Sequence, residues 1–338
     1  MANRGIDKNI VFKKIDGIDE WNRLLEVLDA DNLYNSWSWG EYKQKLGWDV
    51  HRVVIKVANC DTPVGLFQLQ KRNKFLLRLY LIQGGVRIKG DEAFCTDVLN
   101  QLCKHYCVSK WRDVIFINYY AEHDEIHFRA LLATCFTPVV SGSMYTFTLD
   151  TSDVQSHYQT GLSGNWRHNL KRGQKNSELV ISWAQSRDAR LAALARLEGM
   201  YLGLGARKGF ALPISVNLIK DIVADDKKFL VCEAVYKGEV VAVRVGYRCH
   251  NYVIDFLAAS SDGAKNNYAN YVLIWSLIAK CEEFGLAFFE CGGIDPSGNV
   301  GVYNFKKGLG GRLLTLGPLW IFSRSRFLEL MAKLSLAG

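Results

Sequence analysis

A glycine-rich, basic stretch near the C-terminus, residues 288–311 (FFECGGIDPSGNVGVYNFKKGLGG), holds the residues best suited by type and spacing to chemistry. It begins as an apolar strand and continues with seven glycines, which permit positive φ angles and close backbone approach. Asp295 precedes a proline, a pair typical of turns, and Tyr303, Phe305, Lys306 and Lys307 follow. A lysine ammonium beside a reacting carbonyl or phosphate stabilises developing negative charge. The pattern predicts a loop with a catalytic or anion-binding lysine, and a basic surface hairpin is the alternative.

Other kinds of catalytic chemistry find no support in the sequence. Cys103, His105 and Cys107 are close together, but no second ligand pair follows at zinc spacing. His123 and His127 lack the H-E-x-x-H pattern. There is no G-x-S-x-G, no Walker loop and no G-x-G-x-x-G after a strand. We therefore expect no metal site, no covalent nucleophile and no nucleotide cofactor.

Composition and charge limit the classes of protein to which the chain can belong. A chain of 338 residues has room for two domains, and its net charge of +8 suits an anionic partner such as RNA, a nucleotide-linked substrate or a membrane surface. Nine scattered cysteines without a C-x-x-C pair predict reduced thiols. The N-terminus lacks a signal-peptide pattern, and no apolar window is long enough to span a bilayer. We expect a cytoplasmic protein, monomeric, with peripheral contact at the inner face of the membrane as an option.

The elements that must position these residues occur twice along the chain. Each copy reads as three strands, an amphipathic helix and a buried strand, and matching elements are about 175 residues apart. The first copy covers 51–58, 64–72, 76–85, 92–108 and 113–120, and the second covers 227–236, 240–248, 251–260, 268–284 and 286–293. The order predicts an α/β (α+β) protein of two tandem units with mixed central sheets flanked by helices. We place the first domain at 1–148, with a helix at 317–338 packed on it, and the second at 149–316.

Two amphipathic segments flank the second copy. The predicted helix GNWRHNLKRGQKNSE at 164–178 carries Arg167, Lys171 and Arg172, so it is either an anion-binding face or a solvated one. Residues 323–338 carry an apolar stripe beside basic residues, which predicts a helix that packs on the first domain or touches a membrane surface.

Four sequence blocks resemble those of the Fem-type peptidyltransferases, which build peptidoglycan bridges from aminoacyl-tRNA. They are YNSWSWGEYKQKLGWDVHRVVI, GNWRHNLKRGQKNSELVI, MYLGLGARKGFALP and GGIDPSGNVGVYNFKKGLGG, in family order over roughly residues 34–320. The resemblance implies two tandem GNAT-like domains, in agreement with the duplication. There is no room for the coiled-coil arm that some members carry.

The resemblance also implies roles for individual residues. Lys43, preceded by Trp39, matches a lysine that holds the substrate's nucleotide diphosphate, and Arg207 matches another substrate or phosphate contact. Phe305 and Lys306 match a pair at the transfer centre, where Lys306 would stabilise the tetrahedral oxyanion. Further candidates for substrate binding are Tyr252, Tyr303 and Asp295, and for tRNA or anion binding Arg167, Lys171, Arg172 and Lys307. The chain departs from the family pattern at Asn118, Ala211 and Leu212, which leaves the acceptor open.

The function implied is transfer of an amino acid from aminoacyl-tRNA to an amine of a UDP- or lipid-linked peptidoglycan precursor or related envelope molecule, without a cofactor. One alternative is acyl-CoA-dependent N-acylation in envelope or capsular polysaccharide biosynthesis. Residues 260–271 (SSDGAKNNYANY) lack the glycine-rich motif that cradles the CoA pyrophosphate, which favours tRNA. A binding module without activity is the third alternative, and the retained Phe-Lys-Lys signature argues against it.

Overall fold

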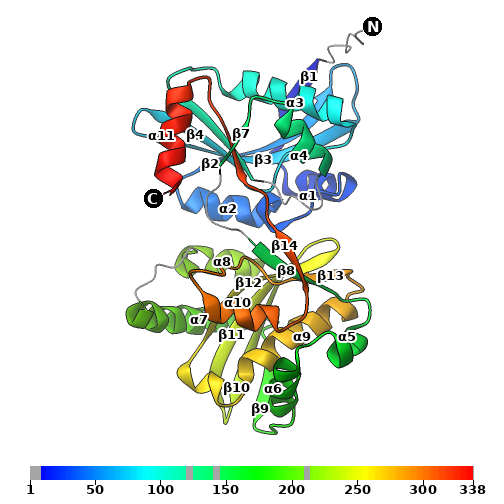
Figure 1. The fold of residues 1–338 in the computed structure, drawn as a ribbon, viewed down its shortest axis with the longest axis vertical. Helices are drawn as coiled ribbons and strands as arrows, with labels where there is room; N and C mark the ends of the chain where they lie inside the picture. Colours follow the sequence, from blue (N-terminus) through cyan, green and yellow to red (C-terminus); the bar gives the residue numbers. More distant parts are fainter. Residues whose placement is uncertain (1–8, 119–124, 140–144, 209–213, 338) are drawn as a thin grey trace. The chain divides into compact units, whose positions relative to one another are not determined.

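The computed structural model describes residues 9–118, 125–139, 145–208 and 214–337 and divides the chain into two compact units (Figure 1). The first unit combines Met1–Met144 with Thr315–Gly338, and the second is Tyr145–Leu314. The sequence placed these limits at 148/149 and 316/317. In the described residues, no helix is long and apolar enough to cross a membrane.

The first unit is a mixed sheet with helices on both faces. Its strand order is β1-β2-β3-β4-β6-β15-β7, with β5 beside β3, and only the β4–β6 pair among those strands is parallel. Alternation along the strands sends one set of side chains toward α3 and α4 and the other toward α1 and α11. The strands are β1 Ile10–Lys14, β2 Asp49–Val57, β3 Pro63–Lys74, β4 Leu77–Ile82, β5 Arg87–Ile88, β6 Asp113–Asn118, β7 Thr137–Val139 and β15 Leu319–Phe322. The helices are α1 Ile18–Val27, α2 Trp37–Lys45, α3 Glu92–Tyr106, α4 Glu125–Leu132 and α11 Arg326–Ala337, with a 3₁₀ turn at Leu33–Asn35.

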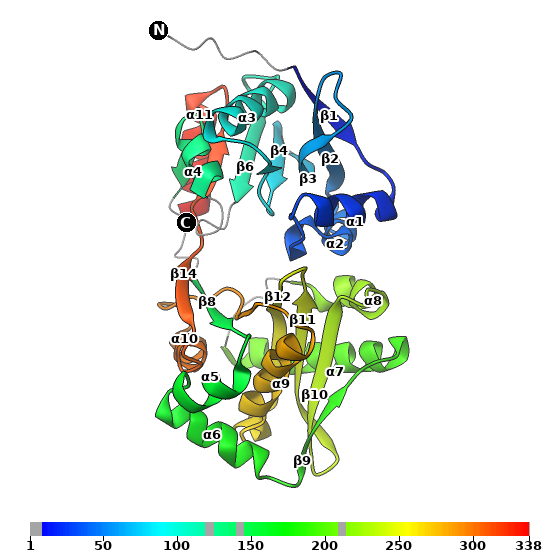
Figure 2. The same cartoon turned by 90° about the vertical axis from the view of Figure 1, so that its right-hand side faces the viewer.

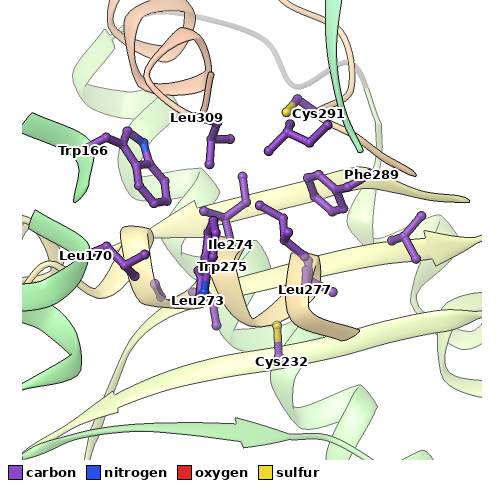
Figure 3. Packing of buried hydrophobic residues seen from close by; sticks show 14 of the residues in the cluster. Trp166, Leu170, Cys232, Leu273, Ile274, Trp275, Leu277, Phe289, Cys291 and Leu309 are labelled. Carbon is purple, nitrogen blue, oxygen red and sulfur yellow. The ribbon is translucent and has the colours of Figure 1, made fainter. Parts of the chain in front are cut away.

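The second unit repeats this architecture. Its strand order is β14-β8-β13-β12-β11-β10-β9, and β12 and β13 pair in parallel. The core lies between the sheet and the helices α6 and α9 and includes Trp166, Trp275 and Phe289 (Figure 3). The strands are β8 Tyr145–Asp150, β9 Leu179–Trp183, β10 Phe229–Tyr236, β11 Glu239–Arg248, β12 Tyr252–Ser260, β13 Phe288–Glu290 and β14 Arg312–Thr315. The helices are α5 Val154–Thr160, α6 Gly164–Gln174, α7 Arg187–Lys208, α8 Val216–Asp225, α9 Ala269–Glu283 and α10 Val300–Lys307, with a 3₁₀ turn at Asp262–Lys265.

The two copies correspond element by element, which confirms the predicted tandem α/β fold. The matching strands are β2 with β10, β3 with β11, β4 with β12 and β6 with β13, and α3 matches α9. One expectation was wrong in part: residues 288–311 are not one glycine-rich loop or hairpin, because Val300–Lys307 form the helix α10.

One strand returns to the first unit from beyond the second. β8 is the first strand of the second unit and pairs with β13 of the same sheet. β15 follows the second unit along the chain but inserts between β6 and β7 of the first. The first sheet is therefore completed by a strand that is distant from the rest of its unit in sequence.

Candidate functional site

The parallel strands β12 and β13 of the second unit separate partway along their length. They pair only from Tyr252–Phe288 to Ile254–Glu290, after which β13 ends and β12 continues to Ser260. A β-bulge lies at this point, because Gly246 of β11 faces Asp255 while Val245 faces Leu257. Backbone groups of β12 beyond the separation need other partners, and the Ala258 N–H donates to the Tyr201 hydroxyl at 3.1 Å.

A cluster of buried charges occupies this separation. Arg244 Nη1 donates to Asp255 Oδ2 at 2.6 Å, and both side chains are only 5% exposed. Lys306 Nζ lies 3.9 Å from the same Asp255 oxygen and donates to the Gly293 carbonyl at 3.4 Å. The Asp255 Oδ1 and Arg244 Nε atoms are buried and have no hydrogen-bond partner in the described structure. Since buried polar groups are normally paired, these atoms mark a place that a polar ligand group can complete.

Glu290 adds a titratable group to the cluster. It is the last residue of β13 and is buried. Burial raises the pKa of Glu290 to about 7, and the nearby Lys306 ammonium acts in the opposite direction. Burial also raises the pKa of the neighbouring Cys291 thiol far above its ordinary value, so this cysteine is a core side chain and not a thiolate nucleophile.

Helix α10 holds Lys306 in place through contacts with α5 and α6 (Figure 2). Trp166 Nε1 of α6 donates to the Phe305 carbonyl at 3.0 Å, and the Phe305 ring packs against Trp166 and Tyr271. His157 Nε2 lies 2.7 Å from the Leu309 carbonyl, just after the helix. The structure therefore gives Phe305 an anchoring position in an aromatic cluster, while Lys306 reaches the charged cluster.

Asp295 stabilises the turn that precedes α10. Its Oδ1 accepts hydrogen bonds from the backbone N–H groups of Ser297 and Gly298, each at 2.9 Å. These bonds lower the pKa of Asp295, and they make it a turn-forming residue.

The other candidates of the second unit lie away from the charged cluster. Tyr252 stacks on Phe288 with ring centroids 4.7 Å apart, at the paired end of the strands. Tyr303 packs near Phe147, and Lys307 Nζ lies 5.7 Å from the Tyr303 ring on the exposed side of α10.

The basic helix is α6, as predicted. Two of its three candidate cations donate hydrogen bonds within the second unit, and the third is exposed. Arg167 donates to the carbonyls of Tyr158 and Leu162, so it fixes the preceding segment. Arg172 donates to the Tyr268 hydroxyl at 2.8 Å. Lys171 is exposed and is the candidate of this helix best placed to meet an anion in solution.

In the first unit, the Lys43 ammonium lies near two indole rings. Its Nζ is 5.1 Å from the Trp39 ring and 5.7 Å from the Trp48 ring. Trp39 Nε1 donates to Gln83 Oε1 at 2.9 Å, which fixes the ring orientation. Burial lowers the pKa of Lys43 to about 8, and no ion pair of this lysine occurs in the described residues. A desolvated ammonium without a carboxylate favours an anionic ligand.

Several predicted positions fall outside the description. Arg207 belongs to the last turn of α7, but its side chain is not among the described residues, and neither are Ala211 and Leu212. His123 is also outside them. Asn118 ends β6, as expected for the strand.

Sequence reasoning missed Arg244, Asp255 and Glu290. Each is a charged residue inside an otherwise apolar strand, in VVAVRVGYR, YVIDFLAAS and AFFECGG. Charged side chains are seldom buried unless paired or functional, so this signal was available.

Comparison with known proteins agrees with this architecture. The family model described as an acetyltransferase (GNAT) domain matches residues 163–307. No curated protein matches the sequence significantly. The crystal structure of FemX superposes with a TM-score of 0.77 at 14% identity, covering 96% of this chain and all of FemX.

Two further solved structures share the fold. The C-terminal domain of a putative lysylphosphatidylglycerol synthetase from Agrobacterium fabrum has a TM-score of 0.59 at 13% identity, covering 95% of this chain and 97% of its own. A tandem GNAT protein from the clavulanic acid biosynthesis pathway has a TM-score of 0.52 at 10% identity, covering 94% and 99%. The chain is thus a protein of tandem GNAT fold. More specifically, its arrangement is the Fem-type one, followed over the full length of FemX.

Proposed function

We propose that this protein is an aminoacyltransferase that moves an amino acid from aminoacyl-tRNA to an amine of a peptidoglycan precursor or related envelope molecule. The main support for the proposal is the position of Lys306, which lies at the separation of β12 and β13 beside the buried Arg244–Asp255 pair. GNAT-type architecture supports acyl transfer in general.

In the proposed reaction, the acceptor amine attacks the ester carbonyl of the aminoacyl donor. A C–N bond forms, the C–O ester bond breaks, and the proton lost by the amine ends on the leaving ribose hydroxyl. The Lys306 ammonium stabilises the oxyanion of the tetrahedral intermediate. Asp255 already accepts a short hydrogen bond from Arg244, so it positions Lys306 without fully neutralising it. Positioning and oxyanion stabilisation supply the rate enhancement, and no covalent enzyme intermediate is needed.

The helix N-termini favour tRNA over CoA as donor. A CoA pyrophosphate requires free N–H groups at the start of the helix that follows the third strand of a GNAT unit. In the second unit, Asn267 Oδ1 accepts from the Ala269 N–H at 3.1 Å, and Tyr268 occupies the N-cap of α9. In the first unit, the Asp91 carboxylate accepts from the Phe94 N–H at the start of α3. The anionic Asp91 cap in the first unit repels a pyrophosphate, and the Asn267 amide oxygen in the second unit already occupies the Ala269 N–H.

Lys43 is the proposed contact for the acceptor's diphosphate. Its partly desolvated ammonium between Trp39 and Trp48 gains a counter-charge when a nucleotide- or lipid-linked diphosphate binds. Lys43→Ala should therefore raise the apparent KM for the acceptor with little change in kcat, and Lys45→Ala, an exposed lysine of the same helix, is the matched control. An unchanged KM would remove Lys43 from the acceptor site.

The deciding experiment measures transfer of a labelled amino acid from charged tRNA to cell-wall precursors, with acetyl-CoA in a parallel reaction. We expect transfer that is abolished by RNase and indifferent to CoA. The alternative, CoA-dependent N-acylation, is favoured by the acetyltransferase description of the matching family model. RNase-insensitive transfer that requires a CoA thioester would establish that alternative and exclude the tRNA-dependent one.

A further inference from the structure

Three segments of the first unit meet at one end of its sheet. β4 and β6 are parallel and both begin there, so the β3–β4 hairpin tip and the segment before β6 lie side by side. β15 runs antiparallel to β6, with Phe322 opposite Ile115, so the chain leaves β15 at the same end. We call the surface formed by residues 72–78, 108–113 and 323–327 the hairpin edge.

Direct contacts hold the hairpin edge together. The Arg78 N–H donates to the Arg112 carbonyl at 2.6 Å, and Arg112 Nε donates to the Leu76 carbonyl at 3.3 Å. Arg324 Nη1 donates to the Val108 carbonyl at 3.4 Å. The three segments therefore form one surface and not three independent loops.

Large apolar side chains project from the hairpin edge into solvent. Phe75 is 95% exposed, Leu76 79%, and Trp111 and Val108 66% each, with Phe327 of α11 also exposed. Single exposed apolar residues are ordinary, but five gathered on connected segments indicate a surface that binds something.

The backbone at the hairpin tip adds an independent sign. Phe75 has a φ of +54°, in the left-handed region where glycine or asparagine is normally found. A bulky aromatic residue there is strained, and at 95% exposure it gains no packing in return. The fold alone would be served better by glycine, so the phenylalanine is explained by what it contacts outside the chain.

Cations surround these apolar groups. The three segments contain seven basic residues: Arg72, Lys74, Arg78, Lys110, Arg112, Arg324 and Arg326. Their one acid is Asp113, which is buried and accepts from Arg78 Nε at 2.7 Å. The hairpin edge is thus strongly positive around an apolar tip.

We propose that the hairpin edge binds an anionic lipid bilayer surface, with Phe75 and Leu76 inserted at the headgroup–acyl boundary and the surrounding cations on the lipid phosphates. Lysines and arginines near an anionic surface and apolar side chains within the interface act together in such binding. Exposed leucine and valine side chains such as Leu76 and Val108 gain little from RNA, whose backbone offers charge but no apolar phase, so RNA fits this surface less well. The residues of the hairpin edge are not those assigned to acyl transfer, so the lipid-binding role does not depend on the identity of the acyl donor.

The test is co-sedimentation of the purified full-length protein with vesicles of phosphatidylcholine alone or phosphatidylcholine mixed with phosphatidylglycerol. We expect binding to the anionic vesicles, weakened by salt, and little binding to phosphatidylcholine. The variant Phe75→Gly/Leu76→Ser removes both tip side chains while relieving the left-handed strain, so it should fold normally and lose binding by about tenfold or more. Lys74→Glu/Lys110→Glu should lose binding by at least as much.

Matched controls are Leu202→Ser, an exposed leucine of α7, and Lys227→Glu, an exposed lysine of the second unit; both should bind vesicles like the unaltered protein. The proposal fails if the tip variant binds anionic vesicles as well as the unaltered protein does, or if phosphatidylcholine alone binds equally. It also fails if the unaltered protein does not bind vesicles and the tip variant instead loses tRNA binding, which would assign the surface to RNA. Loss of a dimer seen by light scattering, again without vesicle binding, would assign the surface to another copy of the chain.

Discussion

Glu290 makes the stability of the folded protein depend on pH. Burial holds its pKa at about 7 against an ordinary 4.5, so the folded chain keeps a proton that the unfolded chain releases. This contribution to stability is complete below about pH 4.5 and is lost as pH rises to about 7. Glu290→Gln, which stays neutral, should be more stable than the unaltered protein near pH 8 by up to about 3 kcal/mol. Urea unfolding near pH 4.5 and pH 8 checks this, and a difference that is the same at both would contradict it.

Lys306 is the residue on which the proposed chemistry depends most. Lys306→Ala should lower kcat by about 10²-fold or more, because it removes the oxyanion's cation. Lys306→Arg keeps the charge but not the compact ammonium, so it should recover only part of the rate. Steady-state transfer assays measure both, with Lys227→Ala, an exposed lysine of the second unit, as the control. A Lys306→Ala rate within a few-fold of the unaltered enzyme would exclude Lys306 from the mechanism.

At this scale, the sequence located the lysine but not its partners. Lys306 was found because it sits in a recognisable block, whereas Asp255 and Arg244 come from strands and precede it by 51 and 62 residues. Only the strand pairing brings them together, and pairing register is not readable from either strand alone. Phe305 was placed at the transfer centre by resemblance, and its ring packs in the core against Trp166 and Tyr271.

At the scale of elements, α10 shows why a glycine-rich stretch becomes a helix. Its local propensity is poor, since Gly301 and the β-branched Val300 and Val302 weaken it. Asn299 caps it by accepting from the Val302 N–H, and the Ser163 N–H donates to the Gly308 carbonyl at its end. Tertiary contacts with α6 thus decide the conformation, which is why the sequence suggested a loop.

The glycines after α10 serve close packing, and Gly310 gives a testable case. It has a φ of +75°, and a Cβ there would overlap the Gly161 carbonyl. Gly285 has a similar φ of +65° but open space around it. Gly285→Ala should therefore cost only the strain of the left-handed conformation, about 1 kcal/mol, while Gly310→Ala should cost clearly more, about 3 kcal/mol or above. Thermal or urea unfolding measures both, and equal losses would mean that the α5–α10 contact yields without cost.

At the scale of the whole molecule, the duplication was visible in the sequence but the return of β15 to the first sheet was not. Hydrophobic periodicity identifies a strand and its length, so matching elements could be aligned at an offset of about 175 residues. It does not say which sheet a strand joins. β8 and β15 each lie next to a unit boundary along the chain, and their partners are fixed by pairing with β13 and with β6 and β7.

The return of β15 to the first sheet makes the two units unequal when the chain is shortened. A chain ending at Leu316 keeps all seven strands of the second sheet but removes β15 from between β6 and β7, together with the fully buried Trp320 and Ile321. Loss of a buried tryptophan side chain alone costs about 3–5 kcal/mol, and the open ladder adds to this, which approaches the whole stability of a domain. We therefore expect calorimetry to show loss of the first unit's unfolding transition, while residues 145–316 fold as a fragment. A chain ending at Ser323 retains β15 and lacks only α11, so it should keep both units with the first one weakened. If the chain ending at Leu316 unfolded like the full-length protein, β15 would not be an integral strand of the first sheet.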